Sequence, residues 1–307
     1  MNSVEYKSTR GDERVISSSQ AIVKGIAEDG GLFIPTKMPR LDIDLKDLIE
    51  LGYKEMAYEI LKLYLTDFTE KELKDCINNA YDNKFDTPSI APVVKAKDDY
   101  FLELFHGPTL AFKDMALTIL PYLLKTASKK LSISKEIVIL TATSGDTGKA
   151  ALEGFADVDG IKIIVYFPQN GVSEVQKRQM ISQEGNNTYV IGIEGNFDDA
   201  QSGVKSIFTD EVFNEKLNNK GYMLSSANSI NIGRLVPQVV YYFYAYAQLC
   251  KNGEISLGDK INFVVPTGNF GNILAGYYAK LMGLPVDKLI CASNENKVLY
   301  DFMSTGT

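Results

Sequence analysis

Residues 136–148 have the sequence EIVILTATSGDTG, and this stretch decides the fold. An aliphatic run over 136–141 leads directly into a turn of small residues that contains two glycines. Such an unbroken apolar run is typical of a strand that is covered on both faces, as strands of parallel sheets are. Helical spacing of apolar residues then follows over 145–155, so the stretch predicts a strand, a tight turn and a helix.

The same alternation continues along the chain towards residue 292. Further strands are predicted over 161–167, 188–193, 222–225, 261–265 and 289–292, and further helices over 173–183, 197–208, 230–250 and 270–282. Short apolar strands that alternate with helices favour a parallel sheet with helices on both faces. The sequence therefore predicts an α/β fold.

The segment before residue 136 has a different pattern. Residues 1–92 are mainly helical, with predicted helices over 45–65 and over 69–81, the second opened by a capping box at Thr69. A hairpin is predicted over 93–104, and a helix over 112–130 that Pro121 is expected to kink.

Composition limits the classes of partner. The 307 residues are 45% hydrophobic and 23% charged, which provides material for a core, and the net charge of 32 − 39 = −7 argues against nucleic acid as the main partner. The most apolar stretch, 235–250, is interrupted by Pro237 and two glutamines, so no membrane partner is expected. Three scattered cysteines and a polar N-terminus predict a cytoplasmic protein.

His106 is the single histidine of the chain. One histidine excludes metal sites built from several imidazoles, and no metal is predicted. We interpret His106 as a residue that packs its loop, with a catalytic role as the alternative.

Two predicted strand ends are suited to anions. The segments 141–148 and 264–272 each follow a strand, contain two glycines and open a helix, and helix N-termini bind anions. Ordinary turn chemistry is the alternative for either one. Neither segment contains a dinucleotide or Walker A motif, since Thr143 stands where the latter needs its first glycine. The pair indicates a small ligand with a phosphate group, together with a second anion.

Lys113 lies in the segment 106–114, HGPTLAFKD, beside Phe112 at a predicted helix start. Apolar surroundings and a helix N-terminus both disfavour the ammonium form, which makes an amine nucleophilic for Schiff-base chemistry. A solvated surface charge is the alternative.

Four segments in order, 106–114, 141–148, 226–234 and 268–272, closely resemble the threonine synthase family, as does the N-terminal stretch 20–33. The resemblance implies fold type II of the pyridoxal-phosphate (PLP) enzymes, the tryptophan-synthase-β-like fold, with two parallel-type sheets flanked by helices. It implies a carbon–oxygen lyase that converts O-phospho-L-homoserine and water to L-threonine and phosphate.

The resemblance also implies roles for individual residues. Lys113 is the expected catalytic residue, which holds the cofactor as a Schiff base. The expected donors to the cofactor phosphate are Gly268, Asn269, Phe270, Gly271 and Asn272. The expected contacts to the substrate carboxylate are Ser144, Gly145, Asp146 and Thr147, and those to the substrate phosphate are Asn228, Ser229, Asn231 and Arg234.

The implied domains are a large cofactor-binding domain of residues 93–134 and 224–307 and a small mobile substrate domain of residues 135–223. We expect a monomer or homodimer with a small-molecule substrate. One alternative is another fold type II lyase, such as a threonine or serine dehydratase. The other is a truncated fragment that keeps the fold without activity, since chains of this family continue beyond the position of Thr307.

Overall fold

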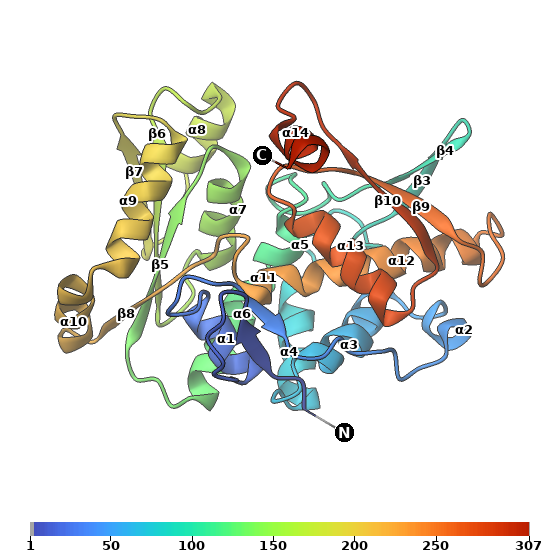
Figure 1. The fold of residues 1–307 in the computed structure, drawn as a ribbon, viewed down its shortest axis with the longest axis horizontal. Coiled ribbons are helices and arrows are strands. Elements are labelled where there is room, and N and C mark those ends of the chain that lie inside the picture. The colour runs from blue at the N-terminus through green and yellow to red at the C-terminus, as the bar shows by residue number, and fades with distance from the viewer. Residues whose placement is uncertain (1–2, 307) are drawn as a thin grey trace.

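Four parallel strands form the largest sheet of the protein, which is described for residues 3–306 by a computed structural model (Figure 1). The strands are β5 (Glu136–Ala142), β6 (Ile161–Pro168), β7 (Thr188–Ile193) and β8 (Tyr222–Ser225), in the order β7–β6–β5–β8. All three pairings are parallel, so the carboxyl ends of the strands meet at one edge of the sheet. The α/β prediction is confirmed.

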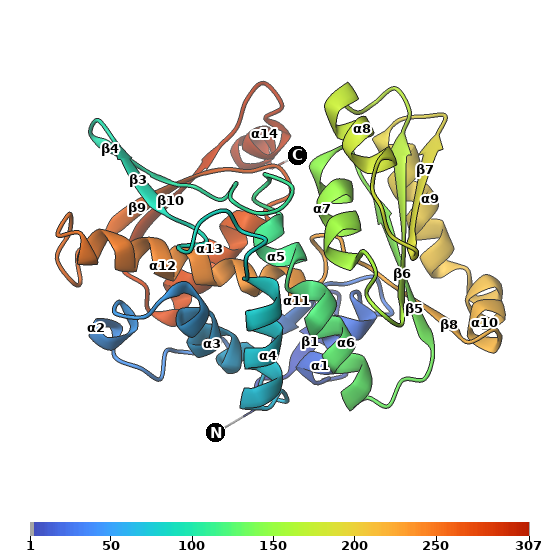
Figure 2. The same ribbon diagram turned by 180° about the vertical axis from the view of Figure 1, so that it is seen from behind.

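Helices cover both faces of this sheet (Figures 1 and 2). One face carries α7 (Asp146–Phe155) and α8 (Glu174–Ile181), and the other carries α9 (Phe197–Thr209) and α10 (Glu211–Asn219). Alternate residues of β5 enter different cores: Ile139 belongs to the main core and Leu140 to a smaller one beneath α9. This two-sided burial explains why β5 is an unbroken apolar run.

The other half of the molecule contains a second parallel sheet. It consists of β9 (Ile261–Pro266) and β10 (Val286–Ala292), next to the helices α12 (Pro237–Lys251) and α13 (Gly271–Met282). The predicted hairpin is present as the antiparallel pair β3 (Val93–Ala96) and β4 (Asp99–Leu102). Most of α12 is buried, where it packs against α13 and the N-terminal region.

The N-terminal region is mainly helical, as predicted. Its elements are β1 (Tyr6–Ser8), α1 (Ser18–Lys24), β2 (Phe33–Pro35), α2 (Leu45–Leu48), α3 (Tyr53–Tyr64) and α4 (Glu70–Ala80). The capping box at Thr69 is confirmed, with the Thr69 side chain accepting from Glu72 N–H and the Glu72 side chain accepting from Thr69 N–H. The predicted helix over 45–65 is divided into α2 and α3.

Two other predicted helices are also divided, and prolines mark both breaks. The helix predicted over 112–130 is α5 (Asp114–Leu117) followed by α6 (Leu120–Lys130), and Pro121 lies in the first turn of α6 rather than at a kink. The helix predicted over 230–250 is α11 (Ile232–Leu235) followed by α12, which begins at Pro237. Proline is tolerated in a first turn because its missing N–H would have no intrahelical partner there. The divisions leave α5 and α11 as short helices between the two halves (Figure 1).

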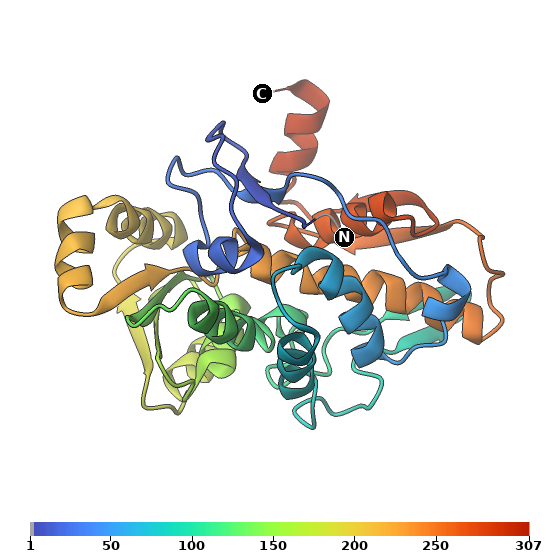
Figure 3. The same cartoon turned by 90° about the horizontal axis from the view of Figure 1, so that it is seen from below.

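The helix α14 (Val298–Thr305), like α10, was not predicted, and it projects away from the rest of the molecule (Figure 3). All of its residues are exposed, including Val298 at 70% and Met303 at 78%. On the neighbouring sheet Val264 and Ile290 are paired across β9 and β10, and both are exposed. This side of the described chain therefore presents apolar surface to solvent. None of the helices within residues 3–306 combines the length and apolarity that crossing a membrane requires.

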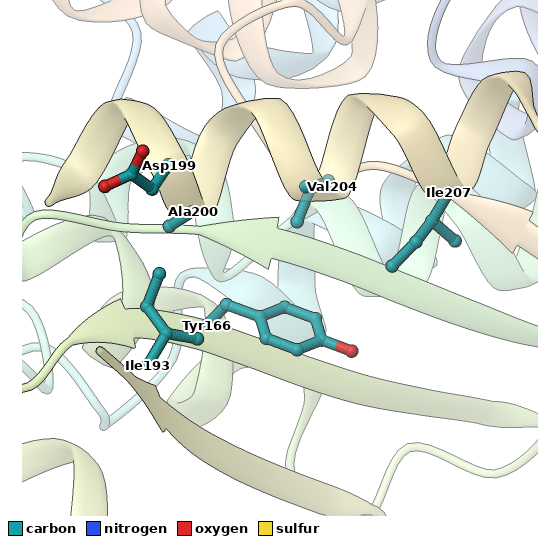
Figure 4. A pocket seen from close by; sticks show the side chains of 7 residues that line it. Tyr166, Ile193, Asp199, Ala200, Val204 and Ile207 are labelled. Carbon is teal, nitrogen blue, oxygen red and sulfur yellow. The ribbon is translucent and has the colours of Figure 1, made fainter. Parts of the chain in front are cut away.

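A small pocket lies between α9 and the outer face of the sheet (Figure 4). Its volume is about 170 Å³, and Tyr166 and Ile193 of the strands lie opposite Ala200 and Val204 of the helix. Gly203 also lines it, and a Cβ added there would have no neighbour within 4 Å.

We predict that Gly203→Ala stabilises the protein by about 1 kcal/mol, because alanine is the better helix former and the added methyl group meets open space. Chemical denaturation measures the free energy of unfolding. Gly154→Ala in α7 is the matched control, since a Cβ at that position would lie 2.2 Å from the Leu117 carbonyl oxygen and should destabilise. Equal destabilisation by both variants would contradict the prediction.

Candidate active site

Lys113 lies at the N-terminal boundary of α5, a short helix near the centre of the molecule (Figure 1). Its side chain is 15% exposed, and its Nζ atom is 4.7 Å from the centroid of the Phe112 ring. Burial lowers the pKa of Lys113 below its ordinary value, the Arg234 charge adds to this effect, and Asp146 opposes it. A lowered pKa increases the fraction of neutral amine, which is the nucleophilic form.

The residue after it, Asp114, fixes the loop that carries Lys113. The buried Asp114 carboxylate accepts hydrogen bonds from Thr109 N–H at 2.8 Å and from the Thr109 hydroxyl at 2.6 Å. Burial raises the pKa of Asp114, and the bonds from Thr109 oppose that rise. The loop can bring Gly107 close to Asp114 only because glycine has no side chain: a Cβ at position 107 would lie 2.5 Å from the Asp114 Cβ. Asp114 was not predicted as a site residue, since its burial was not visible in the sequence.

Asp146, the first residue of α7, binds Lys113. The Lys113 ammonium donates to both Asp146 carboxylate oxygens at 2.7 Å. The turn before Asp146 is built around buried Thr143, whose Oγ1 accepts from Gly145 N–H at 3.0 Å and from Gly148 N–H at 2.9 Å. The ion pair therefore joins the end of β5 to α5.

The other residues of this turn come to the same edge of the sheet. Ser144 is exposed, whereas Asp146 and Thr147 are half-buried. The first N–H groups of a helix have no intrahelical acceptor, so those of Asp146 and Thr147 are available to an anion. The turn thus places donors beside the Lys113 amine.

Arg234 brings a second cation to the site from α11, which packs against both α5 and α13. It is 5% exposed, and within residues 3–306 its side chain makes one hydrogen bond, from Nη1 to the Ala227 carbonyl oxygen at 3.0 Å. Burial lowers the pKa of Arg234 to about 10, and the Asp146 carboxylate opposes the shift. Lys113, Asp146 and Arg234 therefore interact electrostatically as one cluster.

The loop before α11 contains the remaining residues expected at the substrate phosphate. Asn228 and Ser229 are half-buried, and Ser229 Cβ lies 3.7 Å from the position of a Cβ added at Gly271. Asn231 is different, because its buried amide is fully engaged with the main chain: it accepts from Gly233 N–H and donates to the carbonyls of Ile22 and Ser226.

The turn between β9 and α13 forms a cradle of main-chain donors. Within residues 3–306, the N–H groups of five consecutive residues have no acceptor: Gly268, Asn269, Phe270, Gly271 and Asn272. Phe270 has a left-handed backbone with φ of 60°, and the Asn272 side chain donates to the Pro266 carbonyl at 2.9 Å, which shapes the turn. A Cβ added at Gly268 would meet nothing within 4 Å. Unpaired donors at a helix N-terminus suit a phosphate group.

Comparison with known proteins assigns the chain to a family. The model described as "Threonine synthase N terminus" matches residues 5–81, and that described as "Pyridoxal-phosphate dependent enzyme" matches residues 88–307. The chain belongs to the PLP-dependent enzymes of fold type II, in their threonine synthase family. The second model covers the Lys113 loop, both anion-type turns and Arg234.

The relatives from the threonine synthase family are longer than this chain. "Threonine synthase-like 1" of Homo sapiens is 45% identical over 299 residues, which are 94% of this chain and 40% of that protein. Threonine synthase of Schizosaccharomyces pombe is 40% identical over 313 residues, 99% of this chain and 59% of that protein. The PLP-bound threonine synthase structure from Brucella melitensis matches with a TM-score of 0.87 and 39% identity, covering 99% of this chain and 63% of that one.

Both ring nitrogens of His106 have a carboxylate partner. Nδ1 lies 2.6 Å from Asp86 Oδ1, and Nε2 lies 2.9 Å from Glu103 Oε2. Ionised carboxylates only accept, so both nitrogens donate and the ring is charged. This geometry supports the interpretation of His106 as a loop-packing residue. The described residues contain no cluster of acidic, cysteine and histidine side chains suited to a metal ion.

We predict a pH-dependent contribution of His106 to stability. Burial lowers the pKa of His106, but the bonds to Glu103 and Asp86 outweigh it, so the net pKa lies above its ordinary value of about 6.5. The contribution is then fully present below the ordinary value and is lost as pH rises through the raised pKa. The difference in unfolding free energy between the unaltered chain and His106→Gln should shrink accordingly. Because the chain has one histidine, a single imidazole NMR resonance reports the pKa, and titration at or below the ordinary value would refute the prediction.

Proposed function

We propose that the site converts O-phospho-L-homoserine and water to L-threonine and phosphate. The observation that carries the proposal is that the largely buried Lys113 interacts with the Arg234 guanidinium, and that α11, which carries Arg234, packs against α13 where the cradle of residues 268–272 begins. A reaction in which both the cofactor and the substrate carry a phosphate group needs two such places. The threonine synthase relatives support the same assignment.

The residues present fit the cofactor. Lys113 would hold PLP through its amine, and the N–H groups of residues 268–272 would bind the cofactor phosphate. When bound, PLP supplies an electron sink that stabilises negative charge at carbon atoms of an attached amino acid.

The chain's own residues would then act on the substrate. We assign to the Lys113 amine, once the substrate amine has taken its place, the removal of the proton at the substrate Cα. Arg234 binds the substrate phosphate until it leaves, since the planar guanidinium can donate two parallel hydrogen bonds to phosphate. The helix N-terminus at Ser144–Thr147 receives the substrate carboxylate.

We further propose that residues 135–223 act as a small domain that closes over the substrate against residues 93–134 and 224–307. The Lys113–Asp146 ion pair is a contact between these two parts. Closure would exclude water while charge develops on the substrate. Location in the cytoplasm and assembly as a monomer or homodimer stay predictions from the sequence.

A second candidate is a chain that binds PLP without turnover. The exposed apolar residues of α14, β9 and β10 favour it, because large apolar surfaces are normally covered in a working protein. Phosphate release from O-phosphohomoserine separates the two candidates.

We predict that PLP gives the chain a visible absorbance band and that borohydride fixes the cofactor to the peptide that contains Lys113. Lys113→Ala should abolish both, as seen by absorbance and peptide mass spectrometry. Lys149→Ala is the matched control, since Lys149 is equally buried and has a carboxylate partner of its own, Glu153. Label at another lysine would refute the assignment of Lys113. Label with turnover of threonine or serine, but no phosphate release, would instead indicate a dehydratase.

We predict that Arg234→Lys raises the KM for O-phosphohomoserine by about 10–100-fold, because a charged hydrogen bond worth about 1.5–3 kcal/mol is lost. Steady-state phosphate release measures the effect, and borohydride labelling of Lys113 should be unchanged. Arg178→Lys on the exposed face of α8 is the control. An unchanged KM in Arg234→Lys would exclude Arg234 from phosphate binding.

A further inference from the structure

Asn231 lies at the start of α11, where it joins three segments of the chain. Its Oδ1 accepts from Gly233 N–H at 2.9 Å, which caps α11. Its Nδ2 donates to the Ser226 carbonyl and to the Ile22 carbonyl, each at 3.0 Å. The side chain is 1% exposed, and these bonds use both of its N–H groups. Its donors therefore point to protein carbonyls.

The residue that Asn231 supports is Arg234, three positions along the same short helix. Arg234 is nearly buried, and within the described chain only one of its five N–H donors is paired. A buried guanidinium with unpaired donors is costly, so the fold must hold it in place before an anion arrives. A helix as short as α11 lacks the intrinsic stability to do this alone.

The support comes from the C-terminus of α1. The last carbonyls of a helix have no intrahelical donor. In α1, the carbonyls of Ile22 and Val23 instead accept hydrogen bonds from side chains of residues 225–231. Asn231 donates to Ile22, and the Ser225 hydroxyl donates to Val23 at 2.8 Å. Two hydrogen bonds thus attach the N-terminal region to the loop that leads into α11, the helix that carries Arg234.

Two glycines allow this close approach. A Cβ added at Gly25, whose φ is +71°, would lie 3.3 Å from Asn231 Nδ2 and 3.4 Å from Ser226 N. A Cβ added at Gly233 would lie 3.1 Å from the Ile22 side chain. The N-terminus of α1 is itself held by Asp67, which accepts from Ser19 N–H at 3.1 Å and from the Ser18 hydroxyl. Hydrogen bonds therefore hold α1 at both of its ends.

We propose that Asn231 and Ser225 are positioning residues that fix Arg234 for anion binding by attaching its loop to the C-terminus of α1. Neither side chain touches the anion. The N-terminal region then serves the anion site as a support, although it supplies no ligand to it. The inference rests on the proposed role of Arg234 in phosphate binding, and it replaces the expectation that Asn231 contacts the substrate.

The test measures the reactivity of Arg234 in the cofactor-loaded chain. Phenylglyoxal modifies arginines, and peptide mass spectrometry resolves Arg234 from the other four. Inorganic phosphate should protect Arg234, and the concentration that gives half protection reports phosphate affinity. We expect that concentration to rise about tenfold in Asn231→Ala and about threefold in Ser225→Ala, from the loss of buried hydrogen bonds. Borohydride labelling of Lys113 should be unchanged in both variants.

Ser225→Ala separates positioning from direct contact. Ser225 is fully buried with its hydroxyl bonded to Val23, so it affects phosphate only through the loop. If Asn231 were a phosphate ligand, Asn231→Ala would weaken protection and Ser225→Ala would not, and that result would overturn the proposal. Asn231→Ser serves if Asn231→Ala does not fold: a serine can cap α11 but does not reach both carbonyls, so weakened protection is expected again.

Asn187→Ala is the matched control. Asn187 makes the same pattern of bonds at the opposite end of the four-stranded sheet, accepting from Asp157 N–H at 2.7 Å and donating to the carbonyls of Phe155 and Ile161 at 2.8 Å. It should lose similar stability and keep its phosphate affinity. An equal loss of affinity in this control would overturn the proposal as a general effect of destabilisation. If phosphate does not protect Arg234 in the unaltered chain, the role of Arg234 fails, and the positioning role fails with it.

Discussion

The ion pair between Lys113 and Asp146 is the contact on which the arrangement of the site depends. A lysine that is 15% exposed loses most of its hydration, and a carboxylate with both oxygens at 2.7 Å compensates for that loss. The neighbouring structure fixes the two partners separately. Asp114 and Thr109 hold the loop of Lys113, and Thr143 holds the turn of Asp146. The hydrogen bonds within these two turns thus hold Lys113 and Asp146 in the positions where they form the ion pair.

Interruptions of helices have as much influence on the site as the helices themselves. Pro121 and Pro237 each lie in the first turn of a longer helix, and a single short helical turn precedes each of these helices. Lys113 immediately precedes one of these turns, α5, and Arg234 lies within the other, α11. In a continuous helix through either region, the direction of each side chain would be set by its position around the helix axis. The breaks instead allow both cations to face the same interior space.

The sequence predicts the parts of this protein that depend on local pattern. The strand β5, the turn after it and the capping box at Thr69 can be predicted from the sequence. Each depends on the spacing of apolar residues or on helix-capping side chains within a few neighbouring residues. The burial of Asp114 and the engagement of the Asn231 amide were not predicted. Each depends on packing between segments that are distant in sequence, and no local periodicity encodes such contacts. The exposed helix α14 was missed because its residues lie beside no core that would organise them.

The attachment of α1 to the Arg234 loop also has a consequence for the order of folding. Its two hydrogen bonds join residues that are 209 and 202 positions apart, so they contribute strongly to the contact order of the chain. During synthesis, the C-terminus of α1 emerges from the ribosome long before the side chains that complete it. Until residues 225–231 have been made, these two carbonyls of the first helix can bond only to water. The partners of the Lys113–Asp146 pair are only 33 positions apart, so that pair can form while the support of the anion site is still incomplete.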